Sequence, residues 1–149
     1  MTRIPPPMGR RGVPAVYADG TALAQFLPGA PLHRPWIAWV QGRRVVTSQV
    51  GVTELQGAAA VGSLAVRAAA DEVVESVEVL RFSDKALDVA SHVSTALPPF
   101  VALHLGVAAT NSDVAHVATY FGDLAKVAAL YQLDVVTPGW PDRWWENLP

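Results

Sequence analysis

Two acidic residues of this chain have neighbours and spacing that suit metal chemistry. The first, Asp19, directly follows a short apolar run at residues 14–18, and the hydroxyl of Thr21 lies two residues further on. Carboxylate and hydroxyl oxygens suit a hard cation such as Mg²⁺, which takes oxygen ligands and keeps several of its waters. Asp19 could equally be the N-cap of the helix that follows, and the residue alone leaves both readings open.

The second acidic residue, Glu54, lies in the otherwise apolar segment 50–55. An acid in such a segment either faces solvent or points at a positive group. Taken by itself, Glu54 fits the solvent-facing reading better. Neither acid alone therefore identifies a site.

Short apolar runs alternate along the chain with segments of helical periodicity, and these elements must position the two acids. The expected strands are 14–18, 44–47, 77–80, 114–119 and 133–136. The expected helices are 21–27, 36–40, 49–70 (one helix or two), 84–96, 98–108 and 122–131. This alternation predicts an α/β fold with βαβ crossovers and a mostly parallel sheet covered on both faces. Ligands of such sheets bind beyond the carboxyl ends of the strands, where Asp19 is expected.

The length and composition indicate one domain. A chain of 149 residues with 51% hydrophobic and 16% charged residues favours a compact fold. The low share of charged residues also favours self-association. The net charge of −2 does not indicate nucleic-acid binding, so any RNA contact would be local. We expect a mobile leader at 1–12, the folded domain at 13–139 and a tryptophan-rich tail at 140–149.

Several classes of protein are disfavoured. The absence of cysteine excludes disulfides and thiolate metal sites. No apolar run reaches the ~18 residues of a membrane span, and three prolines follow the basic start where a signal peptide needs an apolar stretch. We expect a cytoplasmic protein without membrane contact. Without a G-x-G-x-x-G, P-loop or G-x-S-x-G motif, we expect no small-molecule cofactor.

Four segments match a known pattern in order and spacing. Residues 16–23 read VYADGTAL, and residues 45–48 run into Thr53, Glu54 and Leu55. Residues 101–105 read VALHL, and residues 119–121 precede the final run 135–139. From residue 13 to residue 139 the chain resembles the PIN-domain ribonucleases, especially the VapC-like toxins of VapBC-type toxin–antitoxin modules.

The resemblance implies a five-stranded parallel sheet of order 3-2-1-4-5 with an acidic pocket at its carboxyl edge. Members of the family hold one or two Mg²⁺ or Mn²⁺ ions there with three or four carboxylates and cleave RNA. Asp19 and Glu54 match the first two acids. The third acid of the family, which opens an Asp-Ala-x-His-Leu helix, falls on Val101, and the fourth falls on Phe121.

This departure weakens the implied site, because valine and phenylalanine cannot bind a metal ion. About two negative charges remain in place of three or four, so the affinity for Mg²⁺ should fall sharply. The hydroxyls of Thr21 and Thr119 could support the two acids. Asp123 is the candidate substitute ligand, although a first-turn aspartate also complements the helix dipole.

The remaining polar and aromatic residues have ordinary explanations. His104 fits a packed, hydrogen-bonded histidine, and Asp113 fits a loop residue. The pairs Arg10-Arg11 and Arg43-Arg44 fit a solvated surface better than phosphate binding. The tryptophans could stack on bases or form a protein interface, and the near-neutral charge favours the interface.

Our leading hypothesis is a VapC-like PIN protein of Mg²⁺- or Mn²⁺-dependent endoribonuclease ancestry with an incomplete, weak or inactive site. By analogy with the toxins, its partners would be an antitoxin-like protein or a second copy, with RNA as a possible ligand. The alternative is a non-catalytic module that binds a partner protein or RNA. A third hypothesis is an obligate subunit that pairs with an intact PIN protein.

Overall fold

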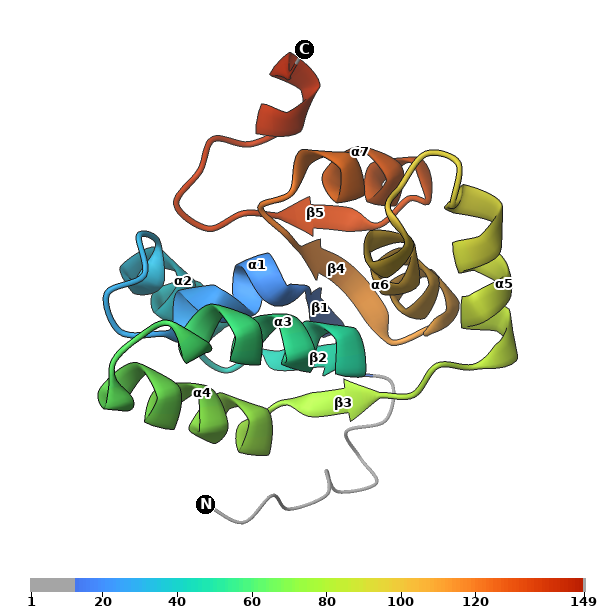
Figure 1. Cartoon of the computed structure of the whole chain (residues 1–149). Helices are drawn as coiled ribbons and strands as arrows, with labels where there is room; N and C mark the ends of the chain where they lie inside the picture. The colour runs from blue at the N-terminus through green and yellow to red at the C-terminus, as the bar shows by residue number, and fades with distance from the viewer. Residues whose placement is uncertain (1–12, 149) are drawn as a thin grey trace.

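A single parallel sheet lies between two layers of helices in the computed structural model, which describes residues 13–148 (Figure 1). Its five strands follow the order β3-β2-β1-β4-β5. The predicted α/β fold and strand order are therefore confirmed. The predicted leader, residues 1–12, lies outside the described residues.

The strands lie close to their predicted positions. They are β1 Ala15–Ala18, β2 Arg44–Ser48, β3 Glu78–Leu80, β4 Val114–Ala118 and β5 Asp134–Val136. β1 is central, and its Tyr17 pairs with Val46 of β2 and Val117 of β4. All four residues of β1 are buried, because helices cover both faces of the sheet. This explains the unbroken apolar run before Asp19.

The helices connect the strands, and the bounds of several differ from the prediction by a few residues. They are α1 Gly20–Leu23 with the 3₁₀ turn η2 Ala24–Phe26, α2 His33–Val40, α3 Gln49–Ala60, α4 Leu64–Ser76, α5 Asp84–Val93, α6 Pro99–Thr110, α7 Gly122–Leu130 and the 3₁₀ turn η3 Trp144–Asn147. The segment 49–70 forms two helices, because Ser63 caps α4 by accepting a bond from the Val66 N–H, and α4 continues to Ser76. α2 starts three residues earlier than predicted. Among residues 13–148, no helix is both long and apolar enough to cross a membrane.

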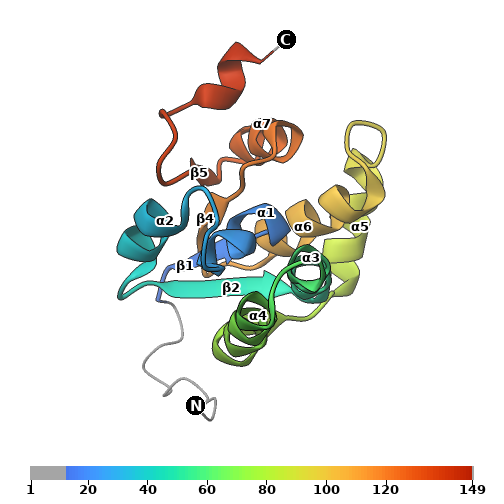
Figure 2. The same ribbon diagram turned by 60° about the vertical axis from the view of Figure 1, so that its left-hand side comes forward.

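Each face of the sheet has its own core. Helices α5, α6 and α7 cover the face that contains Ala15 and Tyr17. Helices α1 to α4 cover the opposite face, with Val16 and Ala18 (Figure 2). The alternation follows from the two-residue period of a strand. Helices α5 and α6 lie so close that a Cβ on Gly106 would stand 2.2 Å from the Ala86 carbonyl oxygen, and this packing fixes the position of α6.

The amino edge of the sheet carries an ion cluster of Arg44, Glu78 and Asp113. The guanidinium of Arg44 lies 2.9 Å from a carboxylate oxygen of each acid, and its side chain is 12% exposed. The prediction of a solvated arginine pair is therefore wrong for Arg44, because the start of β2 is flanked by the start of β3 and the residue before β4. Arg43 is exposed and lies over the Trp39 ring at 4.1 Å.

Candidate functional site

Asp19 lies at the carboxyl end of β1, beside the end of β4. Its backbone N–H donates to the Ala118 carbonyl at 3.2 Å, and the residue is only 3% exposed. Its Oδ1 accepts bonds from the Thr21 hydroxyl at 2.6 Å and the Ala22 N–H at 3.0 Å, and its Oδ2 accepts from the Thr119 hydroxyl at 2.5 Å. The N-cap reading of Asp19 is confirmed, and both predicted threonines are at the acid.

The two threonine hydroxyls tie Asp19 to the next segment of backbone. Thr21 Oγ1 accepts the Tyr120 N–H at 2.8 Å, and Thr119 Oγ1 accepts the Phe121 N–H at 3.0 Å. Each hydroxyl therefore donates its proton to Asp19, and its oxygen accepts a backbone N–H. Burial raises the pKa of Asp19, although the charge of His104 and the hydrogen bonds oppose this shift.

Glu54 reaches the same edge of the sheet from α3. Its Oε1 accepts the Gly20 N–H at 3.0 Å and a bond from His104 Nε2 at 2.6 Å, and its side chain is 39% exposed. A Cβ on Gly20 would stand 2.3 Å from the Glu54 Cβ, so only glycine allows this approach. Glu54 thus contacts the residue next to Asp19, and it both meets solvent and contacts a basic group.

The pKa of Glu54 shifts in the direction opposite to that of Asp19. Burial raises it, but the hydrogen bond and charge of His104, together with the Gly20 N–H, outweigh burial and leave the pKa lowered. The two acids of the site therefore differ in their preferred charge state. Glu54 is held ionised, whereas burial disfavours ionisation of Asp19.

A chain of buried hydrogen bonds continues from Glu54 into the core. His104 is 1% exposed, and its Nδ1 lies 2.7 Å from the Tyr17 hydroxyl, which lies 2.8 Å from Ser48 Oγ. The prediction that His104 is packed and hydrogen-bonded is confirmed. Its contact with Glu54 was not predicted, although His104 lies three residues after Val101 and therefore on the same side of α6.

The structure brings together two of the three predicted metal ligands. Val101 is partly buried against the core under α5, α6 and α7, and Phe121 is 36% exposed. Asp123 is exposed in the first turn of α7. Within residues 13–148, no group of three or more His, Cys, Asp or Glu side chains is arranged to hold a metal ion. The donors present therefore do not fit a tightly held divalent ion.

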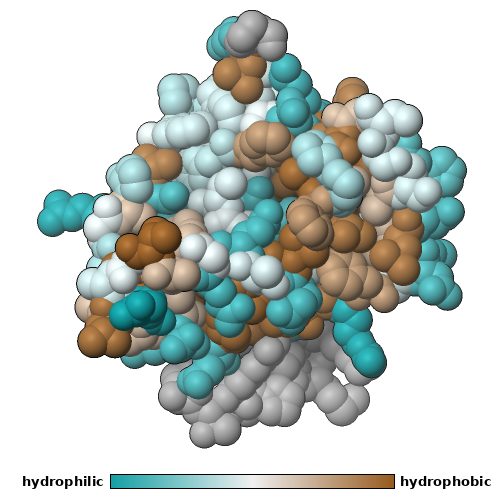
Figure 3. Space-filling model, viewed as in Figure 1, coloured by the Kyte–Doolittle hydropathy of each residue, from teal (hydrophilic) through white to brown (hydrophobic). Residues whose placement is uncertain are grey.

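An apolar pocket of about 210 Å³ adjoins Glu54. Its lining residues come from α3, the segment after β3 and the start of α6: Gln49, Val50, Thr53, Glu54, Phe82 and Phe100. Phe100 is 66% exposed. Apolar side chains gather on this face over α5 and α6 (Figure 3). The ionised acid thus lies at the border of an apolar surface.

The tryptophans of the tail pack against one another and against Tyr120, which lies just after β4. The rings of Tyr120 and Trp140, of Trp140 and Trp144, and of Trp144 and Trp145 meet edge to face, with centroids 5.0, 4.6 and 6.0 Å apart. Such pairs stabilise a fold beyond the area they bury. Much of this aromatic surface therefore holds the tail against the domain.

No family model matches the sequence, and no curated protein matches it significantly.

Proposed function

We propose that this chain is a VapC-like PIN domain of metal-dependent ribonuclease ancestry whose site now has weak or no nuclease activity. The strand order and the positions of Asp19 and Glu54 at the carboxyl edge support this proposal. The observation that carries the proposal is that most carboxylate oxygens of Asp19 and Glu54 are already hydrogen-bonded within the protein. Three of their four oxygens already accept hydrogen bonds from the protein itself.

Competition with these bonds is the physical reason for weak metal binding. A divalent ion at Asp19 would have to enter a buried position and turn the protons of Thr21 and Thr119 away. Hydrogen bonds to charged groups are worth about 1.5–3 kcal/mol each. A site with two carboxylates has little Coulombic attraction to offset that loss.

Cleavage of a structured RNA with Mn²⁺ tests the proposal. We expect little cleavage by the parent protein and a clear gain in the double variant Val101→Asp/Phe121→Asp, which supplies the two missing acids. Adding Asp19→Ala to the double variant should abolish the gain. The matched control, Leu87→Asp/Leu130→Asp, places two acids at exposed apolar positions elsewhere and should stay inactive. Efficient cleavage by the parent that Asp19→Ala abolishes would overturn the proposal.

The apolar pocket beside Glu54 favours a second candidate function, a non-catalytic module that binds a partner protein. An exposed phenylalanine at the rim of a pocket is typical of a protein interface. If the partner is a second copy, Phe100→Ser should weaken self-association measured by sedimentation, while Asp19→Ala and the control Leu130→Ser leave it unchanged. Equal weakening by Leu130→Ser would argue against a role for this pocket.

A further inference from the structure

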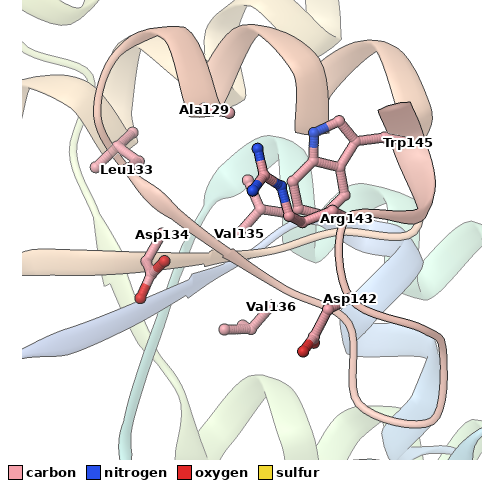
Figure 4. A pocket seen from close by; sticks show the side chains of 8 residues that line it. All are labelled: Ala129, Leu133, Asp134, Val135, Val136, Asp142, Arg143 and Trp145. Carbon is pink, nitrogen blue, oxygen red and sulfur yellow. The ribbon is translucent and has the colours of Figure 1, made fainter. Parts of the chain in front are cut away.

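A hollow of about 470 Å³ surrounds the outer edge of β5 (Figure 4). Its lining comes from α7, from β5 with the residue before it, and from the C-terminal segment: Ala129, Leu133, Asp134, Val135, Val136, Asp142, Arg143 and Trp145. Its volume falls in the range of about 300–1,000 Å³ that is typical of ligand sites. It lies at the opposite end of the strand order from β3, away from the pocket beside Glu54.

The backbone of β5 is available for pairing on this side. In the described sheet β5 is the last strand and pairs with β4, in parallel, through residues 134–136. A parallel ladder engages the groups of alternate residues with one neighbour, so the remaining N–H and C=O groups of β5 point outward. An extended chain could form main-chain hydrogen bonds with these groups.

The two faces of β5 differ in chemistry. Val135 packs on the core under α7 and points to the same side as Arg143 and Trp145 (Figure 4). Asp134, Val136 and Asp142 lie on the other side of the strand (Figure 4). A strand added beside β5 would therefore place alternate side chains against an apolar side and an acidic side.

The charges of the hollow select the partner. The side chain of Asp134 is 80% exposed and meets His116 at 3.6 Å, and Asp142 is also exposed. Arg143 is already bound to Glu146, with two nitrogens 2.9 and 2.6 Å from one carboxylate oxygen. The acidic side therefore favours lysine or arginine. Pairing with β5 of a second copy would bring like charges together, which is destabilising.

We propose that the edge of β5 binds an extended segment of a partner protein in which basic residues alternate with apolar residues. The basic side chains lie against Asp134 and Asp142, and the apolar side chains lie against Val135 and Trp145. This inference goes beyond the proposed nuclease ancestry and does not depend on it. Loss of metal binding or RNA cleavage would leave the edge intact.

Titration of the full chain with short synthetic peptides tests the proposal, with amide hydrogen exchange as the readout. The peptide Lys-Val-Arg-Val-Lys should slow exchange at those amides of residues 134–136 that point away from β4, and it should bind about tenfold more tightly than Glu-Val-Glu-Val-Glu. A peptide of the same composition without alternation, Lys-Lys-Arg-Val-Val, should protect these amides less.

The double variant Asp134→Asn/Asp142→Asn supplies the matched test of charge. It should weaken binding of the basic peptide about tenfold, whereas Asp71→Asn/Glu72→Gln, the same charge change on exposed residues of α4, should not. The proposal is overturned if residues 134–136 gain no protection, if the acidic peptide binds equally well, or if both double variants bind like the parent. Protection that rises with protein concentration alone would assign the edge to a second copy and also overturn it.

Discussion

One pair of carboxylates lies at the amino edge of the sheet, where the strands begin, and another lies at the carboxyl edge, where they end. The two pairs differ in the groups that balance their negative charge. At the amino edge, Glu78 and Asp113 both contact Arg44 at 2.9 Å. At the carboxyl edge, Asp19 and Glu54 accept bonds from hydroxyls, backbone N–H groups and His104. The first pair of acids contacts a permanent cation, whereas most donors to the second pair are uncharged.

This difference separates a structural cluster from a candidate site. Hydrogen bonds that Arg44 donates to Glu78 and Asp113 raise the pKa of the guanidinium, so it stays charged and holds β2, β3 and the segment before β4 together. Among residues 13–148, no arginine or lysine is seen to contact the acids at the carboxyl edge, and Glu54 is 39% exposed. In parallel sheets the carboxyl edge is also the usual position of ligand sites.

Removal of the cation should give the largest loss of stability. We expect Arg44→Met to lower the free energy of unfolding by about 2–3 kcal/mol, because it leaves two partly buried carboxylates close together without a counter-charge. Urea denaturation measures the loss. Adding Glu78→Gln to this variant should restore part of it.

Arg43→Met is the matched control for that substitution. Its exposed guanidinium lies over the Trp39 ring, an interaction worth about 0.5–1 kcal/mol at such sites. Equal losses for the two arginine variants would show that the amino edge does not depend on the cation.

Glu54→Gln should have an intermediate effect that depends on pH. The variant loses a charge-assisted bond to buried His104, and we expect a loss of about 1–2 kcal/mol at neutral pH. Because the pKa of Glu54 is lowered by folding, its stabilising contribution is present above the ordinary glutamate value and is lost as the pH falls through the lowered pKa. The difference between variant and parent should therefore shrink in acid, measured by urea denaturation across pH. The control Glu72→Gln, at an exposed residue, should have a free energy of unfolding close to that of the parent at any pH. A difference for Glu54→Gln that persists in acid would contradict the lowered pKa of Glu54.

Asp19→Asn should have the smallest effect and the opposite dependence on pH. Because the pKa of Asp19 is raised by folding, its contribution is complete below the ordinary aspartate value and is lost as the pH rises through the raised pKa. The stability of the variant relative to the parent should thus improve from acid to neutral pH. The overall loss should be about 1 kcal/mol, because the amide oxygen keeps the bonds from Thr21 and Ala22 and the amide nitrogen cannot accept the bond from Thr119. Thermal unfolding across pH measures this trend. A relative stability that worsens with rising pH would mean that the ionised form of Asp19 is stabilised.

Local patterns allowed the fold to be predicted. The apolar runs that became β1 and β2 are buried on both faces, so they carry the continuous hydrophobic signal of parallel strands. α5 begins at the predicted residue, Asp84, because Ser83 caps it by accepting the Ala86 N–H at 3.0 Å, and α6 begins at Pro99, one residue after the predicted start. Asp19 could be placed for the same reason, because it ends a strand and caps the next helix.

The partners of the charged residues could not be predicted, because they come from distant parts of the chain. Arg44 meets acids 34 and 69 positions away, and Glu54 meets a histidine 50 positions away. Nothing local to Arg44 distinguishes it from the exposed Arg43. The position of Gly20 against Glu54 likewise depends on the packing of α1 against α3 rather than on either segment alone.

Calorimetric titration with Mn²⁺ measures directly whether Asp19 and Glu54, which are engaged by internal donors, hold a divalent ion. The parent protein is compared with the double variant Val101→Asp/Phe121→Asp, and thermal unfolding verifies that both are folded. We predict no measurable heat of binding for the parent and clear binding of one ion by the variant. Comparable, tight binding by both proteins would contradict this prediction, because it would mean that Val101 and Phe121 do not occupy the positions where ligands are missing.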